Sequence, residues 1–321
     1  MLDVVELKNK VVNNYIVTRE DALELVNVDL NELTKQANEI RKHFCGNRFD
    51  ACTIINVKSG KCSENCIFCA QSMHHDTDID IYPLIDTDEL KQKTLMLYDS
   101  GLKRISYVAS GKSVSDYEFN KLYNLIKNLN DEYDDINLCV SLGILDDKQI
   151  RMLKNAGVDR IHNNLESSED YFTEICTTHS YSDKLKTLDM IDGENVMVCS
   201  GGIFGLGETF EDRIDLAIQL RNLGVKSIPI NVLNPIKGTP VEDNEILLND
   251  EVSRIIAIFR FINPDSYIRL AGGRLLLGDN GRKAFQSGAN AAILGDMLTT
   301  DGLKLEDDLK LLDELGFKII Y

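Results

Sequence analysis

Short apolar runs alternate with amphipathic stretches along most of the chain. Four of the apolar runs follow a glycine that closes a helical stretch, at Gly101, Gly157, Gly224 and Gly288. Glycine suits the left-handed turn that ends a helix, because it has no Cβ to clash. Each interval between these glycines is about twice the length of one β/α unit. We therefore expect a second strand inside each interval.

Apolar runs occur at the expected places, and interleaving the two sets gives eight predicted strands. They span residues 52–57, 104–109, 138–143, 160–165, 196–203, 227–233, 267–271 and 291–295. Amphipathic helices are predicted between them: one follows Thr87 with an acidic first turn, and another carries Ile150 and Leu153 on one face. Eight alternating units predict an α/β fold, a (β/α)8 TIM-type barrel.

The rest of the chain is expected to belong to the same single domain. Residues 1 to about 45 are predicted to form a helical extension packed outside the barrel. The barrel is expected at about 50–298 and a C-terminal helix at about 304–316. The sequence contains no low-complexity linker that would indicate a second domain.

Composition restricts the partners and the compartment. The chain has 321 residues, 43% of them hydrophobic, and no run of eighteen apolar residues that would span a membrane. Its formal charge of −17 argues against binding to nucleic acid or to anionic membrane surfaces. The acidic N-terminus lacks a signal-peptide pattern, so the eight cysteines indicate metal ligands rather than disulfides. We expect a cytoplasmic protein.

Three cysteines lie in one short segment with the spacing C-x3-C-x2-C: Cys62, Cys66 and Cys69. Such thiolates can hold three corners of a [4Fe–4S] cluster, and with no fourth cysteine nearby the fourth iron stays open. The alternatives are a zinc site that lacks a ligand and unrelated free thiols. With Phe68 before the last cysteine, the segment resembles the radical S-adenosylmethionine superfamily, in which the open iron chelates S-adenosylmethionine.

A glycine-rich segment follows the fifth predicted strand. Glycines there let a ligand approach the backbone closely. The segment fits the G-x-I-x-G-x-x-E pattern that radical S-adenosylmethionine enzymes use beside the adenine, with Gly201, Gly202, Ile203 and Glu208 as the residues of interest. Because barrel enzymes place their active sites at the C-terminal ends of the strands, we expect this segment and the three-cysteine loop at the same mouth.

Four chemically distinctive residues fall on the odd-numbered predicted strands: Cys52, Cys139, Cys199 and Arg269. Alternate strands fill a barrel interior in layers, so these side chains are expected to share one layer. Buried cysteines can also act as small packing residues. A buried arginine needs an anionic partner, because an unpaired buried charge is costly. A second, anionic iron–sulfur cluster would account for both observations.

These motifs resemble the biotin synthase family of radical S-adenosylmethionine enzymes. Matching segments include 58–66, 162–166, 198–202, 229–233, 237–240, 266–270 and 298–300. The resemblance implies a sulfurtransferase that converts dethiobiotin to biotin. It implies three cofactors: a [4Fe–4S] cluster, S-adenosylmethionine and an auxiliary iron–sulfur cluster, either [2Fe–2S] or a larger 4Fe type. It further implies an electron donor of the flavodoxin or ferredoxin type, and a homodimer.

The family's residue roles carry over by position. Asn164 matches the asparagine near the S-adenosylmethionine ribose and dethiobiotin, and Glu166 stands where the family has a ribose-binding aspartate. Asn231 matches the asparagine at the ureido ring of dethiobiotin, and an amide suits a cyclic urea because it both donates and accepts. The remaining matches are ligands, of the [4Fe–4S] cluster (Cys62, Cys66 and Cys69) and of the auxiliary cluster (Cys139, Cys199 and Arg269).

The auxiliary ligands depart from the family pattern. Ser106 stands where the better-known members have a cysteine, and Cys52 stands where they have a serine. Serine is a poor iron ligand beside thiolate, so we expect Cys52 to replace the missing thiol, with Cys45 as a further candidate. Cys176 has no counterpart, and packing is its expected role; a structural role is likewise expected for His162.

Two other functions stay open at this point. One is a different radical S-adenosylmethionine barrel enzyme that acts on an amino acid or in metal-cofactor assembly; Asn231 and the thiol layer argue against it. The other, from a different class, is a non-catalytic iron–sulfur redox protein. Cleavage of S-adenosylmethionine separates the two classes.

Overall fold

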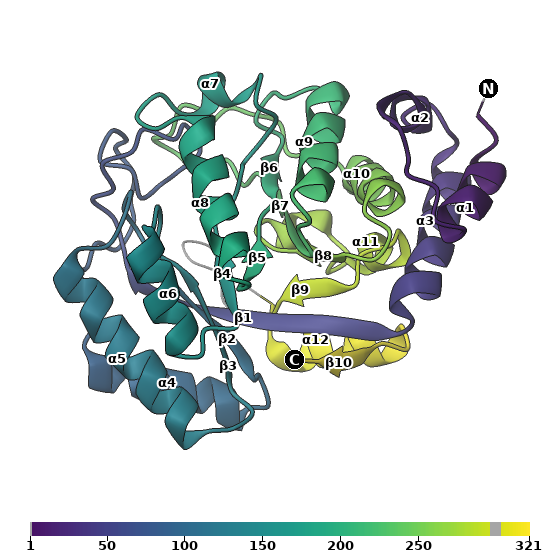
Figure 1. The fold of residues 1–321 in the computed structure, drawn as a ribbon. Helices are drawn as coiled ribbons and strands as arrows, with labels where there is room; N and C mark the ends of the chain where they lie inside the picture. Colours follow the sequence, from purple (N-terminus) through teal and green to yellow (C-terminus); the bar gives the residue numbers. More distant parts are fainter. Residues whose placement is uncertain (1, 296–302) are drawn as a thin grey trace.

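A closed parallel barrel forms the centre of the molecule in a computed structural model, which describes residues 2–295 and 303–321 (Figure 1). Within these residues the barrel strands run in the order β1-β2-β3-β4-β5-β7-β8-β9, and β9 pairs with β1 to close the ring. Their bounds are β1 Arg48–Lys58, β2 Arg104–Ala109, β3 Asn137–Ser141, β4 Arg160–His162, β5 Met197–Cys199, β7 Ser227–Val232, β8 Tyr267–Leu270 and β9 Ala291–Ile293. The predicted (β/α)8 architecture is confirmed.

The predicted fifth strand is divided. Instead of one strand over 196–203, the chain forms β5 and then β6 (Gly202–Phe204), both paired with β7. At the break, a Cβ on Gly201 would lie 2.0 Å from the carbonyl oxygen of Pro229. The two backbones thus approach more closely than any side chain would permit, and the glycine makes this contact feasible.

Helices surround the barrel, and several begin with a reciprocal cap. At the start of α5, α6, α8 and α9, the side chain of the N-cap residue (Ser, Thr or Asp) accepts a hydrogen bond from the backbone N–H of the third helical residue. The side chain of that third residue accepts in turn from the backbone N–H of the N-cap residue. The four helix-ending glycines of the sequence pattern all have positive φ, as expected. The outer helices are α4 Thr87–Asp99, α5 Asp116–Glu132, α6 Asp147–Asn155, α7 Phe172–Ile175, α8 Tyr181–Gly193, α9 Phe210–Asn222, α10 Asn249–Ile262 and α11 Arg282–Gln286, with a 3-10 turn η1 Arg274–Leu277.

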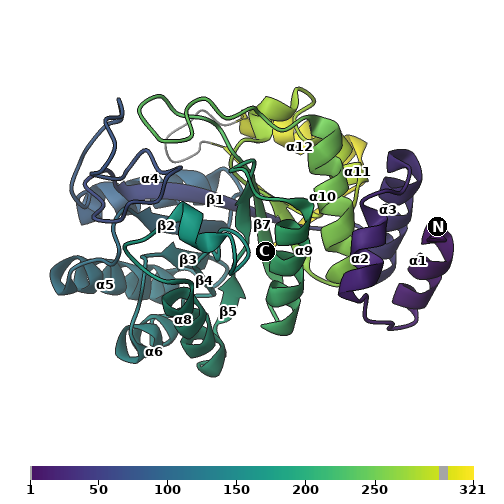
Figure 2. The same ribbon diagram turned by 90° about the horizontal axis from the view of Figure 1, so that it is seen from above.

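Both ends of the chain pack against the outside of the barrel (Figure 2). The N-terminal helices α1 Val4–Val12, α2 Arg19–Leu25 and α3 Leu30–Cys45 contact one another or the helices α9 and α10. At the other end, α12 Leu305–Glu314 leads to β10 Lys318–Ile320, which pairs with the start of β1. The expected barrel end at 298 and the matching segment 298–300 lie outside the described residues. No helix in the described ranges is both long and apolar enough to cross a bilayer.

Candidate active site

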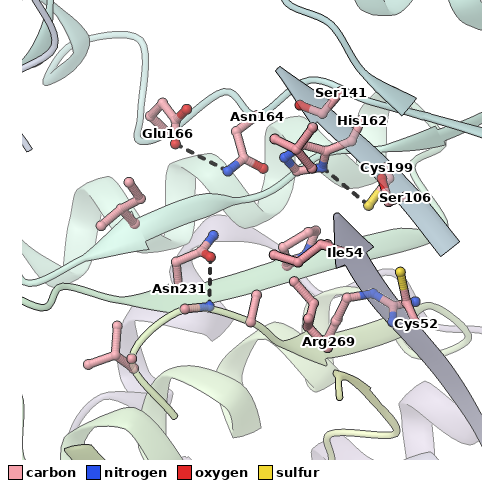
Figure 3. A pocket seen from close by; sticks show the side chains of 18 of the residues that line it. Cys52, Ile54, Ser106, Ser141, His162, Asn164, Glu166, Cys199, Asn231 and Arg269 are labelled. Atoms are coloured by element: carbon pink, nitrogen blue, oxygen red, sulfur yellow. Dashed lines mark hydrogen bonds between the residues drawn. The ribbon is translucent and has the colours of Figure 1, made fainter. Parts of the chain in front are cut away.

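A cavity of about 320 Å³ runs from the barrel interior to the loops that follow the strands (Figure 3). Most of the residues singled out from the sequence line it, although they are spread over more than two hundred positions. These lining residues are Cys52, Phe68, Cys139, Asn164, Glu166, Cys199, Ile203, Asn231 and Arg269. The structure therefore brings the interior thiols and the amide side chains into one space.

The three interior thiols are free and buried, on β1, β3 and β5. Ser106 lines the same cavity and pairs with Cys139 in the β2–β3 ladder. Among the residues described, one other group alone brings three metal-ligating atoms within 4.8 Å of one another. Cys52, Cys139 and Cys199 therefore do not all lie within that distance of one another.

Arginines of the barrel interior converge on one carboxylate, Asp50 on β1. Arg160 Nη2 lies 3.1 Å from Asp50 Oδ2, Arg269 also pairs with Asp50, and Arg104 Nε lies 3.7 Å away and pairs with Asp159. Three arginines thus share two carboxylates, which leaves a net charge of +1 beneath the thiols. Burial alone would raise the pKa of Asp50, but Arg269 and Arg160 outweigh it and hold that pKa well below its usual range.

This network changes the interpretation of Arg269. The sequence led us to expect that its buried charge required an anionic cluster, but Asp50 already supplies an anionic partner. The Arg269 guanidinium also donates to the carbonyl oxygens of Asp50 and Ala292. What still favours an anionic ligand is the excess positive charge of the whole network, because Arg160 and Arg269 both line the cavity.

His162 faces the cavity beside Cys199 (Figure 3), and its Nδ1 lies 3.4 Å from the Cys199 Sγ. Burial would raise the pKa of Cys199, but His162 and Arg160 outweigh it and lower that pKa to about 6. By contrast, burial raises the pKa of Cys139 to about 12 and also raises the pKa of Cys52. Cys199 is therefore the interior thiol most readily deprotonated for metal binding.

The three-cysteine loop lies between β1 and α4, at the C-terminal end of β1. Backbone hydrogen bonds hold it folded: Cys62 N–H donates to Gln71 O (2.9 Å), and Cys69 N–H donates to Cys66 O (3.0 Å). Lys61 precedes the loop with φ +50°, a left-handed conformation that non-glycine residues rarely adopt. Backbone hydrogen bonds thus support the fold of the loop, and Phe68 reaches the cavity from it.

Asn164 and Glu166 are positioned by the glycine-rich segment after β5. Gly201 N–H donates to Asn164 Oδ1 (2.9 Å), and Asn164 Nδ2 donates to Glu166 Oε2 (3.2 Å; Figure 3). Glu166 adopts φ +73°, and β4 ends at His162, three residues before the predicted end at 165. Lys184, which the sequence reading missed, lies 3.9 Å from the Glu166 carboxylate, with both side chains largely buried.

Asn231 is anchored through both ends of its amide. Its Oδ1 accepts from Gly272 N–H (2.9 Å), and its Nδ2 donates to Gly202 O (3.0 Å). These bonds fix the orientation of the amide, because they hold Oδ1 towards Gly272 and Nδ2 towards Gly202. One lone pair and one N–H remain on the amide, which is the complement that a cyclic urea needs.

Several residues expected at the site are absent from the cavity lining, namely Cys62, Cys66, Cys69, Gly201, Gly202, Glu208 and Cys45. The Glu208 carboxylate accepts from Gly205 N–H and Leu206 N–H and pairs with Arg213 (2.7 Å), so it holds the glycine-rich turn instead of lining the cavity. Cys45 ends α3, and its thiol lies 3.7 Å from Arg260 Nη1, on the outside of the barrel. Cys45 is absent from the cavity lining because α3 ends before β1 enters the barrel.

Family comparisons agree with this architecture. Residues 56–220 match the Radical SAM superfamily, and residues 229–318 match the Biotin and Thiamin Synthesis associated domain. Among solved structures, methylornithine synthase superposes with a TM-score of 0.84 at 19% identity, over 98% of this chain and 97% of that one. A maturase of the [FeFe]-hydrogenase gives a TM-score of 0.83 at 19% identity, over 99% of this chain and 75% of that one. These two likenesses describe the fold alone.

A radical S-adenosylmethionine barrel enzyme is thus the class that the fold, the three-cysteine loop and the family match define. Sequence relatives narrow this class to one family. The biotin synthase of Brachyspira hyodysenteriae is 51% identical over 314 residues, which cover 98% of this chain and 94% of that protein. The biotin synthase of Clostridium botulinum is 48% identical, over 99% of this chain and all of that protein. The chain belongs to the biotin synthase family.

Proposed function

We propose that this chain converts dethiobiotin to biotin in the barrel cavity, with sulfur from an auxiliary iron–sulfur cluster held by Cys52, Cys139 and Cys199. The observation that carries the proposal is the convergence of these three free thiols on one cavity that also holds Asn164 and Asn231. Membership of the biotin synthase family supports the reaction. The three thiols and the positive network support the auxiliary cluster.

Cys62, Cys66 and Cys69 are proposed to hold the [4Fe–4S] cluster, and the donor set fits, because three free cysteines lie on one ordered loop beside the cavity. When bound, this cluster and S-adenosylmethionine supply the electron and the hydrogen-abstracting 5′-deoxyadenosyl radical, and the auxiliary cluster supplies the sulfur. The auxiliary cluster is proposed to be of the [2Fe–2S] type or a larger 4Fe type, with Cys52 supplying the third thiol because Ser106 offers only a hydroxyl.

The other side chains bind and orient. Asn164 and Glu166 are proposed to contact the S-adenosylmethionine ribose, alongside the backbone at Gly201, Gly202 and Ile203. Phe68 is proposed to lie beside the same cofactor. Glu208 contributes indirectly, because its carboxylate accepts hydrogen bonds from the turn that follows this backbone.

Asn231 is proposed to pair with the dethiobiotin ureido group. Apolar side chains make up much of the remaining wall and limit the access of water; they include Ile54, Val108, Val232, Leu233 and Ile236. Arg160 and Arg269 face the cavity and offset the negative charge of a sulfide-rich cluster. In this proposal the polar groups that bind the substrate lie at the mouth of the barrel, and the thiols lie deeper inside it.

Further properties of the family are proposed for this chain. They are a reductant of the flavodoxin or ferredoxin type, a homodimer, a cytoplasmic location, and a single domain that includes the N-terminal helices and α12. They rest on the family resemblance.

The test is a single-turnover reaction with the anaerobically reconstituted protein. The clusters are built with 34S sulfide, and the protein is given dithionite, S-adenosylmethionine and dethiobiotin. Mass spectrometry is expected to find 5′-deoxyadenosine and 34S-labelled biotin. A protein that forms no 5′-deoxyadenosine would be a mere electron carrier, and 5′-deoxyadenosine without biotin would indicate another substrate.

A further inference from the structure

A second group of metal-ligating side chains lies against the three-cysteine loop. Cys66, Cys176 and His179 each bring one ligand atom within 4.8 Å of the others, and no other group of three does so among the residues described. Cys176 and His179 follow α7, more than a hundred residues from the loop. This segment packs directly on it, since Ile67 N–H donates to Ile175 O (3.0 Å).

We propose that Cys66, Cys176 and His179 form a mononuclear site for a thiophilic divalent cation, filled while the [4Fe–4S] cluster is absent. Two thiolates and an imidazole are the donor set that Fe2+, Co2+ and Zn2+ accept in proteins. The cation expected in the cell is Fe2+, held beside the loop on which the cluster is built. Cys66 belongs to both sites and serves one at a time.

The geometry is close to that of a filled site. The Cys176 Sγ lies 3.2 Å from His179 Nδ1. Two such atoms bound to one tetrahedral ion, with bonds of about 2.3 Å to sulfur and about 2.0 Å to nitrogen, lie about 3.5 Å apart. An opening of about 0.3 Å, within reach of side-chain rotation, would admit the ion.

Neighbouring groups hold these ligands in place. The Glu64 carboxylate lies 2.5 Å from His179 Nδ1 and accepts from the Thr178 hydroxyl (2.8 Å), and the Cys176 thiol donates to Asn65 Oδ1 (3.3 Å). The side chains of His179 and Glu64 are only 7% and 8% exposed. Glu64 also adds a negative charge that favours a cation, and it offers an oxygen as a further ligand. The ligands are therefore held in place before any metal arrives, and an ion bound at Nδ1 would replace the proton that His179 shares with Glu64.

The exclusive use of Cys66 rests on the proposed function, because it assumes that Cys66 is a cluster ligand. The metal site itself does not depend on that assumption. A cation bound by Cys66 withholds one of the three cluster thiols, so the two states compete. We expect the ion to leave, or to be incorporated, when the cluster forms.

The experiment is a Co2+ titration of the full-length, reduced, cluster-free protein under anaerobic conditions, read by thiolate-to-cobalt charge-transfer absorption and reversed with Zn2+. Removing a group that merely supports a ligand costs about 10–100-fold in metal affinity. Cys176→Ser and His179→Gln should therefore each weaken Co2+ binding by at least about tenfold. Cys69→Ser, the matched control on the same loop but outside the group, should leave the affinity unchanged.

The outcome that overturns the assignment is equal binding by wild type and Cys176→Ser, or an equal loss in Cys69→Ser, since the loop thiols alone would then hold the ion. Circular dichroism of each variant excludes unfolding as the cause of a loss. In a second measurement, wild type with a complete [4Fe–4S] cluster should bind no Co2+ at this site, and retained binding would refute the sharing of Cys66. Formation of 5′-deoxyadenosine by the same samples reports separately on the proposed function.

Discussion

Asp50 and Arg160 form a two-point ion pair across the barrel interior, with Arg160 Nη1 3.3 Å from Asp50 Oδ1 and Nη2 3.1 Å from Oδ2. The two residues lie on β1 and β4, which are not neighbours in the sheet. Their side chains are 2% and 4% exposed. The pair therefore ties opposite walls of the barrel together directly below the proposed auxiliary cluster.

Asp50→Asn should destabilise the fold strongly, because it leaves the buried charges of Arg160 and Arg269 without their carboxylate. Breaking a buried pair by removing one partner costs about 3–5 kcal/mol of unfolding free energy. Urea denaturation measures the loss. The matched control is Asp265→Asn, whose exposed pair with Lys226 should contribute about 1 kcal/mol or less. Similar losses in the two variants would show that the interior network is not a major source of stability.

The same carboxylate predicts a pH dependence. Asp50 has a lower pKa in the folded than in the unfolded protein, so its contribution is complete above the unfolded value of about 3.9 and is lost as the pH falls towards the folded value. As the pH falls below about 4, the unfolding free energy of the wild type should therefore fall more steeply than that of Asp50→Asn. Parallel curves for the two proteins would contradict the ion-pair account.

Cys66→Ala should abolish formation of 5′-deoxyadenosine while the barrel stays folded, because a loop with two thiols cannot hold the [4Fe–4S] cluster. Chromatographic analysis of 5′-deoxyadenosine after dithionite reduction is the measurement, with circular dichroism as the check on folding. Cys45→Ser is the control, since Cys45 lies outside the cavity. Wild-type cleavage by Cys66→Ala would remove the basis for assigning the loop.

Asn231→Ala should weaken dethiobiotin binding by about 1–3 kcal/mol, because the buried ureido group loses a hydrogen-bond partner. The variant also loses the bonds to Gly272 and Gly202, so some loss of stability is expected. Calorimetry with dethiobiotin measures the affinity. Asn244→Ala is the control, because Asn244 makes a similar bond to Gly205 O but does not line the cavity. An unchanged affinity in Asn231→Ala would mean that the substrate or its orientation has been misread.

Much of the barrel could be predicted because its strands are apolar runs bounded by helix-ending glycines, and these signals are local. The short strands were less predictable. β4 ends at His162, three residues before its predicted end, and β10 pairs with β1 from the far end of the chain. Pairings between distant segments have no local signature.

The chemistry of the site was predictable where it followed a motif and not where it arose from packing. Arg104 and Arg160 begin predicted strands, where a charge normally faces solvent, and here both are buried around Asp50. The contact between Cys66 and Cys176 depends on how the segment after α7 packs on the cysteine loop. The sequence signal available for these arginines was a charged residue that directly adjoins an apolar run, because such a charge needs a partner if it is buried.

Cys52 is proposed to take the place of the missing thiol at the auxiliary cluster. This assignment is tested by iron and sulfide analysis with Mössbauer spectroscopy on anaerobically reconstituted wild type, Cys52→Ser and Ser106→Ala. We expect Cys52→Ser to lose the auxiliary iron and biotin formation but to keep cleavage of S-adenosylmethionine, and Ser106→Ala to keep nearly all of its iron. Full iron and turnover in Cys52→Ser, together with loss of both in Ser106→Ala, would contradict the account.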